Sequence, residues 1–136
     1  MDEISGGRVI VTGPTSGLGK EIAAQLASRG ASVILACRDV ERGKQTAGEI
    51  SEHASAAQPA VIPVDTSSHT SIREFAREFR QRYDRLDVLV NNAGVLCPQR
   101  STSVDGVELT FATNVIGYYL MTCELSTCSA AAHPPA

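Results

Sequence analysis

Short runs of consecutive apolar residues alternate along this chain with longer stretches in which apolar residues recur every three or four positions. The short runs are rich in β-branched residues and predict strands buried on both faces, and the longer stretches predict amphipathic helices. The predicted strands are Arg8–Thr12, Ser32–Cys37, Ala60–Asp65 and Asp87–Asn92. The predicted helices are Leu18–Arg29, Asp39 to about Ala54, Ser68–Tyr83 and about Gly106–Leu125. This alternation is typical of βαβ units built on a parallel sheet.

Pro63 indicates where the third strand lies, because proline cannot donate to a strand ladder and is expected at a sheet edge. The order 3-2-1-4 of a dinucleotide-binding half places the third strand at such an edge. We therefore predict an α/β fold. It is the N-terminal part of a Rossmann doubly wound fold, with four parallel strands in order 3-2-1-4 and flanking helices.

The turn after the first strand carries the strongest chemical signal. It reads Thr12-Gly13-Pro14-Thr15-Ser16-Gly17-Leu18-Gly19 and leads from an apolar strand into a helix. Such glycine spacing allows a tight turn, a close approach of backbone to a diphosphate, and close helix–strand packing. The alternative is a tight strand–helix turn that binds no ligand. The predicted cofactor-binding residues of this turn are Gly13, Thr15, Ser16, Gly17, Leu18 and Gly19.

The end of the second strand bears on which dinucleotide is bound. A carboxylate there would accept a hydrogen bond from the ribose 2′-hydroxyl of NAD, whereas an arginine accommodates the 2′-phosphate of NADP. Here Cys37 ends the strand, Arg38 follows it, and Asp39 is placed to cap the next helix. We therefore predict NADP rather than NAD, with Arg38 at the phosphate. Arg38 as an ordinary surface charge is the alternative.

Composition narrows the class of protein. The net charge is −3, and the arginine-dense stretch Arg73–Arg85 is interleaved with acidic residues, which favours a solvated helix face over a nucleic-acid interface. No apolar run approaches the ~20 residues that span a bilayer. The four cysteines and three histidines show no metal-ligand spacing. We predict no nucleic-acid partner, no membrane span, no metal site and a cytoplasmic location.

The motifs together resemble the short-chain dehydrogenase/reductase family over about residues 7 to 125, most closely its retinol-dehydrogenase and WW-domain-oxidoreductase branch. The resemblance rests on the glycine turn, Asp65, the segment Asn91-Asn92-Ala93-Gly94, and Asn114 within Phe111–Val115. It implies that Asp65 contacts adenine and that Asn91, Ala93 and Gly94 lie along the cofactor ribose. It also implies a catalytic role for Asn114, holding a proton-relay water. The implied reaction is hydride transfer between NADP(H) and an alcohol or carbonyl.

One part of the family pattern is missing from these residues. The family uses a serine and then a Tyr-x-x-x-Lys pair, but Lys20 and Lys44 are the only lysines, and Ser16 and Val40 stand four residues before them. The general acid, which supplies about 10²–10⁴-fold in rate, is therefore absent. We expect a truncated family member that is catalytically inactive alone. Residues 1–125 are predicted to form an incomplete NAD(P)-binding domain, and residues 126–136, with Pro134-Pro135, a disordered tail.

The last helix is apolar nearly all round, which predicts burial on more than one face. Asp105 and Glu108 at its start resemble a capping box. A fourth strand without a neighbour leaves an open edge, and the helix over residues 106–125 is a candidate surface for homo- or hetero-oligomers. Two alternatives to a truncated enzyme therefore remain. One is a regulatory binding module that pairs with a full-length relative, and the other is a fragment without function.

Overall fold

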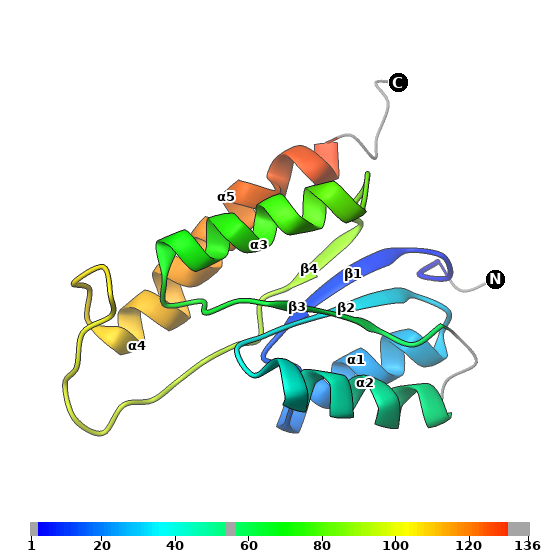
Figure 1. Ribbon diagram of the computed structural model, residues 1–136, viewed down its shortest axis with the longest axis horizontal. Coiled ribbons are helices and arrows are strands. Elements are labelled where there is room, and N and C mark those ends of the chain that lie inside the picture. Colours follow the sequence, from blue (N-terminus) through cyan, green and yellow to red (C-terminus); the bar gives the residue numbers. More distant parts are fainter. Residues whose placement is uncertain (1–2, 54–56, 131–136) are drawn as a thin grey trace.

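The computed structural model describes residues 3–53 and 57–130. Its strands are β1 (Arg8–Thr12), β2 (Ser32–Cys37), β3 (Ala60–Pro63) and β4 (Val88–Val90). Its longer helices are α1 (Gly17–Ser28), α2 (Val40–His53), α3 (His69–Arg82) and α5 (Gly117–Ala130). The short helix α4 (Leu109–Phe111) and the π-helical segment η1 (Ala112–Ile116) run directly into α5 (Figure 1).

The strands pair in parallel in the order β3-β2-β1-β4, as predicted. Pro63 lies on β3, opposite Cys37 of β2, and β3 is an edge strand. The interpretation of that proline is therefore confirmed. Both outer strands are shorter than predicted. Strand β4 begins at Val88; just before it, the Asp87 backbone N–H donates to the Arg8 carbonyl at 2.9 Å and the Asp87 carboxylate accepts the Arg8 N–H at 2.7 Å.

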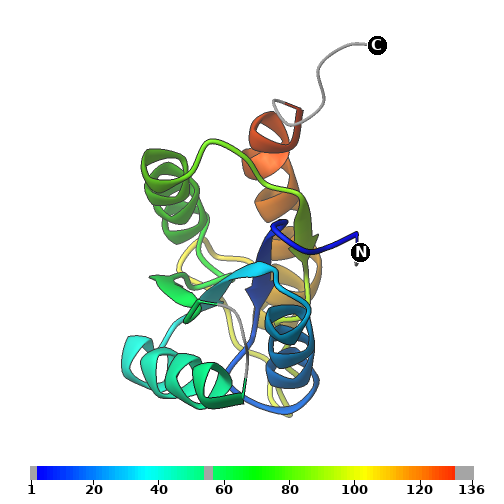
Figure 2. The ribbon, with the colours of Figure 1, turned by 90° about the vertical axis from the view of Figure 1, so that its right-hand side faces the viewer.

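Two hydrophobic cores lie on the two faces of the sheet, because side chains alternate between faces along a strand. Val9 and Val11 of β1 contribute to the core beneath α1 and α2, whereas Ile10 contributes to the core beneath α3 and α5. Figure 2 shows the sheet between these two pairs of helices. Both faces of the sheet are therefore covered, almost completely over β1 and β2 and only in part over the outer strands β3 and β4.

The inner face of α1 consists of small residues. In the sequence Leu18, Ile22 and Leu26 form one apolar stripe, but Leu18 is 70% exposed, Ile22 and Leu26 are only partly buried, and the buried residues are Gly19, Ala23 and Ala27. Small residues occupy the buried face because they let the helix lie close to β1. The apolar stripe visible in the sequence is instead the flank of the helix.

The last helix begins later than predicted and has a different cap. Asp105 does not cap it; its carboxylate accepts the backbone N–H of His69 at 2.9 Å. Glu108 is the cap, accepting from the backbone N–H groups of Thr110 at 3.0 Å and Phe111 at 2.8 Å. These two bonds, first that from Phe111, hold the pKa of Glu108 below its usual value. The capping box was therefore assigned one turn too early.

The prediction of a disordered tail from residue 126 is wrong for residues 126–130, which continue α5. Leu125 and Cys128 are buried in the core beneath α3 and α5, so packing extends the helix past the end of its apolar pattern. The Ser126 hydroxyl donates to the Cys123 carbonyl at 2.8 Å within the same turn. Residues 131–136 lie outside the described residues.

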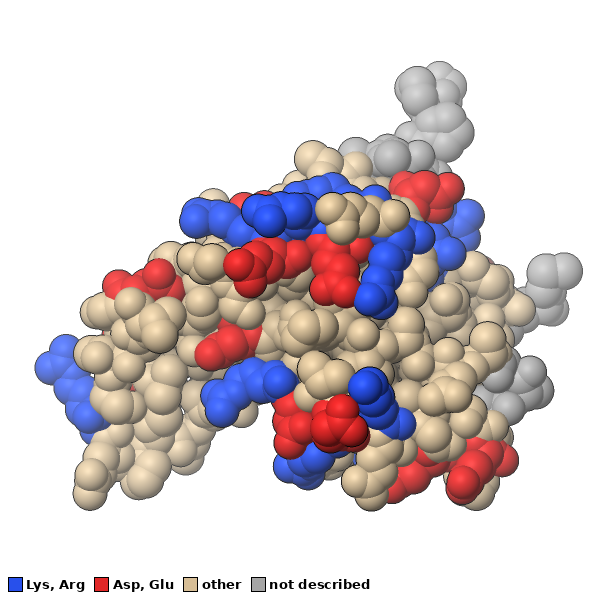
Figure 3. Space-filling view, viewed as in Figure 1, with Lys and Arg blue, Asp and Glu red and all other residues tan. Residues whose placement is uncertain are grey.

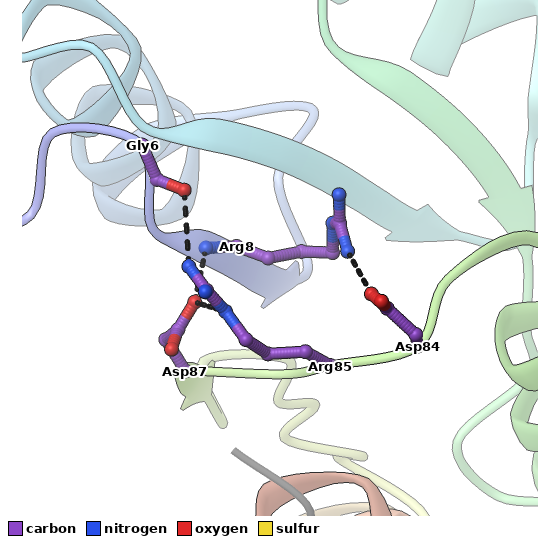
Figure 4. Close-up of polar contacts among 5 residues, drawn as sticks. All are labelled: Gly6, Arg8, Asp84, Arg85 and Asp87. Atoms are coloured by element: carbon purple, nitrogen blue, oxygen red, sulfur yellow. Dashed lines mark hydrogen bonds and ion pairs between the residues drawn. The ribbon is translucent and has the colours of Figure 1, made fainter.

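A polar cluster joins the amino ends of β1 and β4 (Figure 4). Asp87 accepts from the backbone N–H of Arg8 and, at 3.0 Å, from the Arg85 guanidinium. The Arg8 guanidinium pairs with Asp84 at 3.3 Å and lies over the Tyr83 ring. These contacts, chiefly the Arg8 N–H bond, lower the pKa of Asp87.

Charged side chains of both signs cover α3 in Figure 3, whereas the lobe that precedes α4 is mostly uncharged. Ion pairs on this helix include Arg82 with Glu78 at 2.6 Å and Arg73 with Glu124 at 3.6 Å. The arrangement matches the solvated helix face predicted from the interleaved charges.

Candidate dinucleotide site

The glycine turn after β1 has no room for side chains at two of its three glycines. A Cβ on Gly13 would lie 2.9 Å from Ala93 Cα, and Gly13 has a positive φ of 61°. A Cβ on Gly19 would overlap the Gly13 carbonyl oxygen and Asn92 Nδ2. These two glycines therefore permit the close contact of β1, α1 and the segment after β4, as the spacing predicts.

Gly17 has the opposite surroundings. Its φ is +54°, yet nothing lies within 4 Å of a Cβ built there, so the space in front of the turn is open. Ser16 is the N-cap of α1 but its side chain makes no capping hydrogen bond, and the first turn holds no acidic residue. The first N–H groups of α1 are therefore left for an anion at the positive end of the helix dipole.

Thr12 and Asn92 hold this turn in place, and sequence reasoning did not include them among the site residues. The buried Thr12 hydroxyl donates to the Val90 carbonyl at 3.2 Å and accepts from the N–H groups of Asn92 and Ala93, each at 2.9 Å. Asn92 Nδ2 donates to the carbonyls of Thr12 and Gly13, at 3.2 and 3.1 Å. A polar residue ending an otherwise apolar buried strand was the available signal for Thr12.

A cleft of about 500 Å³ opens beside the turn, at the carboxyl ends of the strands. Six of the predicted cofactor-binding residues line it: Gly13, Thr15, Arg38, Asp65, Ala93 and Gly94. Five others lie outside its lining: Ser16, Gly17, Leu18, Gly19 and Asn91. Lining residues that were not predicted include Asp39, Arg42, Val64, Thr66, Val95 and Thr113. Ligands of open α/β sheets bind at this end of the strands.

The wall formed after β2 and β3 carries most of the cleft's charge. Asp39 Oδ1 accepts the backbone N–H of Arg42 at 3.1 Å, so it caps α2 as predicted. Asp65 Oδ1 accepts from the N–H of Ser67 at 2.9 Å and from its hydroxyl at 2.6 Å, which orients the carboxylate. Burial, and then the negative charge of Asp39, raises the pKa of the Cys37 thiol in the same wall.

Asn114 lies in the π-helical segment and binds backbone. Its Oδ1 accepts the N–H of Val95 at 2.9 Å and its Nδ2 donates to the Val95 carbonyl at 2.8 Å. Its side chain therefore fixes the segment after β4 against η1, at the wall of the cleft. A π-helical turn inside an α-helix often marks a functional site.

The other asparagine of the motif, Asn91, points to α5, where Nδ2 donates to the Thr122 hydroxyl at 3.3 Å. Its Oδ1 is buried without a hydrogen-bond partner among the described residues. Gly117 brings α5 against the turn after β3, because a Cβ there would overlap the Thr66 carbonyl oxygen. The segments after β1, β2, β3 and β4, with Leu109 of α4 and Thr113 of η1, therefore line one cleft.

The family comparison agrees with this geometry. The family model described as short chain dehydrogenase matches residues 7–132. The chain belongs to the short-chain dehydrogenase family. Mouse retinol dehydrogenase 12 is 42% identical over 120 residues, and human retinol dehydrogenase 11 is 44% identical over 120 residues. Each match covers 88% of this chain and 38% of the relative, so the chain spans about two fifths of the length of the curated relatives it matches.

Solved structures show the same fold. An uncharacterized protein of Mycobacterium paratuberculosis superposes with a TM-score of 0.80 at 35% identity, covering 93% of this chain and 44% of that one. RhlG of Pseudomonas aeruginosa, solved as a complex with NADP, superposes with a TM-score of 0.77 at 32% identity, covering 92% and 48%. The predicted family and its retinol-dehydrogenase branch are confirmed.

Over residues 3–53 and 57–130, no group of three or more histidine, cysteine, aspartate or glutamate side chains is arranged to hold a metal ion. Within the same ranges, no helix has the length and apolar character needed to cross a membrane.

Proposed function

We propose that this chain is the NADP(H)-binding portion of a short-chain dehydrogenase/reductase whose full reaction is hydride transfer to or from an alcohol or carbonyl. The observation that carries the proposal is the uncapped start of α1, which faces open space at Gly17 beside a cleft that Arg38 lines. Family membership and the NADP complex of RhlG support the same ligand class.

Each part of the cleft suits one part of the dinucleotide. The free N–H groups at the start of α1 would bind the diphosphate, with Thr15 and Gly13 beside it. Arg38 and Asp65 would hold the adenosine end, and Ala93 and Gly94 the ribose on the side of β4. When bound, the nicotinamide donates or accepts the hydride.

Residues 1–136 alone are expected to bind without turnover. No tyrosine here is followed four residues later by lysine, and an asparagine amide such as that of Asn114 does not titrate near neutrality. The Asn114 side chain keeps the Val95 segment in position instead. The purified chain should show no change in NADPH absorbance with a panel of aldehydes and ketones. Turnover with any of them would contradict this proposal.

Cofactor preference is tested by titrating the chain with NADP and with NAD, alongside Arg38→Asp. The wild-type chain should bind NADP more tightly, and Arg38→Asp should reverse the preference, because a carboxylate repels a 2′-phosphate and accepts from a 2′-hydroxyl. Equal affinity of the wild-type chain for both would remove the NADP assignment. Absence of thermal protection by either dinucleotide would favour the fragment without function.

A second candidate function is a binding module that pairs with a full-length relative. The observation in its favour is the outer face of the last helix, where Phe111, Val115 and Tyr119 are 49%, 48% and 69% exposed. These residues recur every four positions and form one apolar stripe. Co-purification with a relative, lost in Val115→Glu, would support it; a monodisperse monomer in the presence of that relative would contradict it.

The cytoplasmic location belongs to the same proposal. Cys37, Cys97, Cys123 and Cys128 are all free thiols, which is typical of proteins kept in a reducing compartment. Fractionation of cells expressing the chain, with a cytoplasmic enzyme as marker, tests the location.

A further inference from the structure

A second cleft lies at the opposite end of the sheet from the candidate dinucleotide site. This amino-end cleft has a volume of about 400 Å³ and is lined by the start of β1 and the end of α3: Arg8, Arg80, Gln81, Arg82, Tyr83 and Asp84. Arg8 is the first residue of β1, and Arg80 and Arg82 lie in the last turn of α3. Guanidinium groups gathered at one cleft are typical of sites that bind oxyanions.

The Arg8 side chain leaves one edge of its guanidinium group unused. Nη1 pairs with Asp84 at 3.3 Å, and the group lies 4.5 Å from the centroid of the Tyr83 ring. Figure 4 shows this side chain extending from β1 toward Asp84. Nε is buried, and over residues 3–53 and 57–130 neither Nε nor Nη2 has a hydrogen-bond partner. Nε and Nη2 form the edge with which arginine donates two parallel hydrogen bonds to a carboxylate or a phosphate.

The arginines of the amino-end cleft are only partly neutralised by carboxylates. Arg80 Nη1 donates to the Glu124 carbonyl at 2.9 Å, and no carboxylate of the described residues pairs with this side chain. Arg82 pairs with Glu78 at 2.6 Å. The Asp84 side chain is 96% exposed, so water screens its attraction for the guanidinium group that it faces. The cleft therefore keeps a positive charge that a bound anion would offset.

A role in the fold accounts for only some of these arginines. Cations in the last turn of a helix are stabilised by the partial negative charge of its carbonyl end, which explains Arg80 and Arg82. Arg8 belongs to β1, where no helix dipole acts on it. A buried N–H without an acceptor is destabilising, and a ligand oxygen would supply the acceptor that Arg8 Nε lacks.

We propose that the amino-end cleft is a second anion site, in which Arg8, Arg80 and Arg82 bind a phosphate group. The free edge of Arg8 donates to two phosphate oxygens, and the two arginines of α3 offset the remaining charge. A phosphate monoester carries about −1.5 to −2 charges at neutral pH, so it suits three guanidinium groups better than a carboxylate does. A free phosphate and the headgroup of an anionic phospholipid present the same chemistry, and the test distinguishes them.

The test is an NMR titration of the 136-residue chain with inorganic phosphate at constant ionic strength. Backbone amide shifts report separately on the two ends of the sheet, which matters because phosphate is also expected at the diphosphate turn. The amides of Tyr83 and Asp84 report on the amino-end cleft, and those of Gly17 and Leu18 report on the turn. The matched control is Arg77→Gln, which removes the same charge from an exposed position of α3 outside the cleft lining.

Arg8→Gln should weaken phosphate binding at the amino-end cleft about tenfold, because it removes a pair of charge-assisted hydrogen bonds. Arg8→Lys should restore part of the loss, because lysine keeps the charge without the planar fork. Arg80→Gln and Arg82→Gln, both at exposed positions, should each weaken binding about threefold without disturbing the fold. Arg77→Gln should leave the affinity unchanged. Raising the salt concentration should weaken binding by the wild type.

Shifts confined to Gly17 and Leu18 would overturn the second site and leave the dinucleotide site intact. Shifts at Tyr83 and Asp84 that Arg80→Gln and Arg82→Gln leave unchanged, or that Arg77→Gln reduces equally, would overturn it as well. The melting temperature of each variant shows whether it is folded.

Co-sedimentation with phosphatidylcholine vesicles that do or do not contain phosphatidic acid separates the two sources of phosphate. Binding of free phosphate without co-sedimentation identifies a soluble ligand. Co-sedimentation that requires phosphatidic acid and is weakened in Arg80→Gln identifies a lipid headgroup. A folded chain that neither binds free phosphate at Tyr83 and Asp84 nor co-sediments with these vesicles overturns the proposal.

Discussion

Two regions of the molecule differ in how fully their groups find partners among the described residues. They are the turn after β1 and the outer face of the last helix. In the turn, Thr12 and Asn92 make five hydrogen bonds that involve backbone groups, and Gly13 and Gly19 leave no room for a side chain. On the outer face, Phe111, Val115 and Tyr119 expose about half or more of their surface. The comparison teaches that segments far apart in this chain complete the turn, whereas the described residues leave the helix face uncovered.

The largest effect is expected from Gly19→Val, which breaks the turn. A Cβ at residue 19 would overlap two atoms, the Gly13 carbonyl oxygen and Asn92 Nδ2. The first belongs to the backbone and the second is hydrogen-bonded to backbone carbonyls, so neither can move freely. Loss of about 3 kcal/mol or more in the free energy of unfolding is expected, as for overpacking at a site that cannot relax. Gly48→Ala is the control, because a Cβ there meets nothing within 4 Å and alanine favours a helix. Denaturant unfolding measures the free energy of unfolding of both variants. A wild-type value for Gly19→Val would contradict the close contact of β1, α1 and the segment after β4.

Thr12→Val should cost about 2 kcal/mol while keeping the shape of the side chain. It leaves the Ala93 N–H without its acceptor and the Asn92 N–H with the Val90 carbonyl alone, beside a buried side chain. Affinity for the dinucleotide should fall as well, because these groups position the turn. Thr12→Ser keeps the hydroxyl and should restore most of the affinity. Equal behaviour of the Val and Ser variants would show that the hydroxyl is not needed.

Asn114→Ala should cost about 1 kcal/mol, because it removes the two bonds to Val95 at a partly exposed site. The effect should be local. Hydrogen exchange at the Val95 amide should speed up, while exchange in β1 and β2 should stay as in the wild type. Uniformly faster exchange would mean that Asn114 supports the whole fold rather than the segment after β4.

The Asp87 cluster predicts how stability depends on pH. The folded pKa of Asp87 is lowered, first by the Arg8 N–H bond, so its contribution is present above the unfolded value of about 3.9 and is lost as pH falls through the folded pKa. Asp87→Asn should therefore lower the melting temperature at pH 6, and the difference from wild type should shrink toward pH 2. A difference that is constant over this range would rule out the charge as its origin.

The smallest effect on stability is expected from Tyr119→Lys on the outer face of the last helix. The side chain is 69% exposed, and surface substitutions of this kind usually change stability by less than about 0.5 kcal/mol. Self-association, measured by sedimentation over a range of concentrations, should nevertheless fall. The control is Lys44→Gln, because Lys44 is exposed on α2, on the other face of the sheet from α5. Phe75→Lys would not serve, because Phe75 is buried in the core.

The candidate site was predictable where its chemistry is local. Gly13, Arg38, Asp65 and Gly94 each follow a strand, and parallel strands bring their carboxyl ends to one edge, so these residues do line one cleft. Asn92 and Arg42 were missed for different reasons. Asn92 bonds backbone carbonyls about 80 residues away, and Arg42 lines the cleft because the first turn of α2 lies beside it.

The amino-acid sequence by itself determined the order of elements, the parallel sheet, the edge position of β3 and the tight glycine turn after β1, because periodicity, proline and glycine act through local backbone geometry. Only the tertiary structure decided which face of α1 is buried, where the last helix starts and ends, and what Asn114 binds. Those features depend on contacts between segments far apart in the chain. There, packing and the pairing of buried polar groups outweigh local preference.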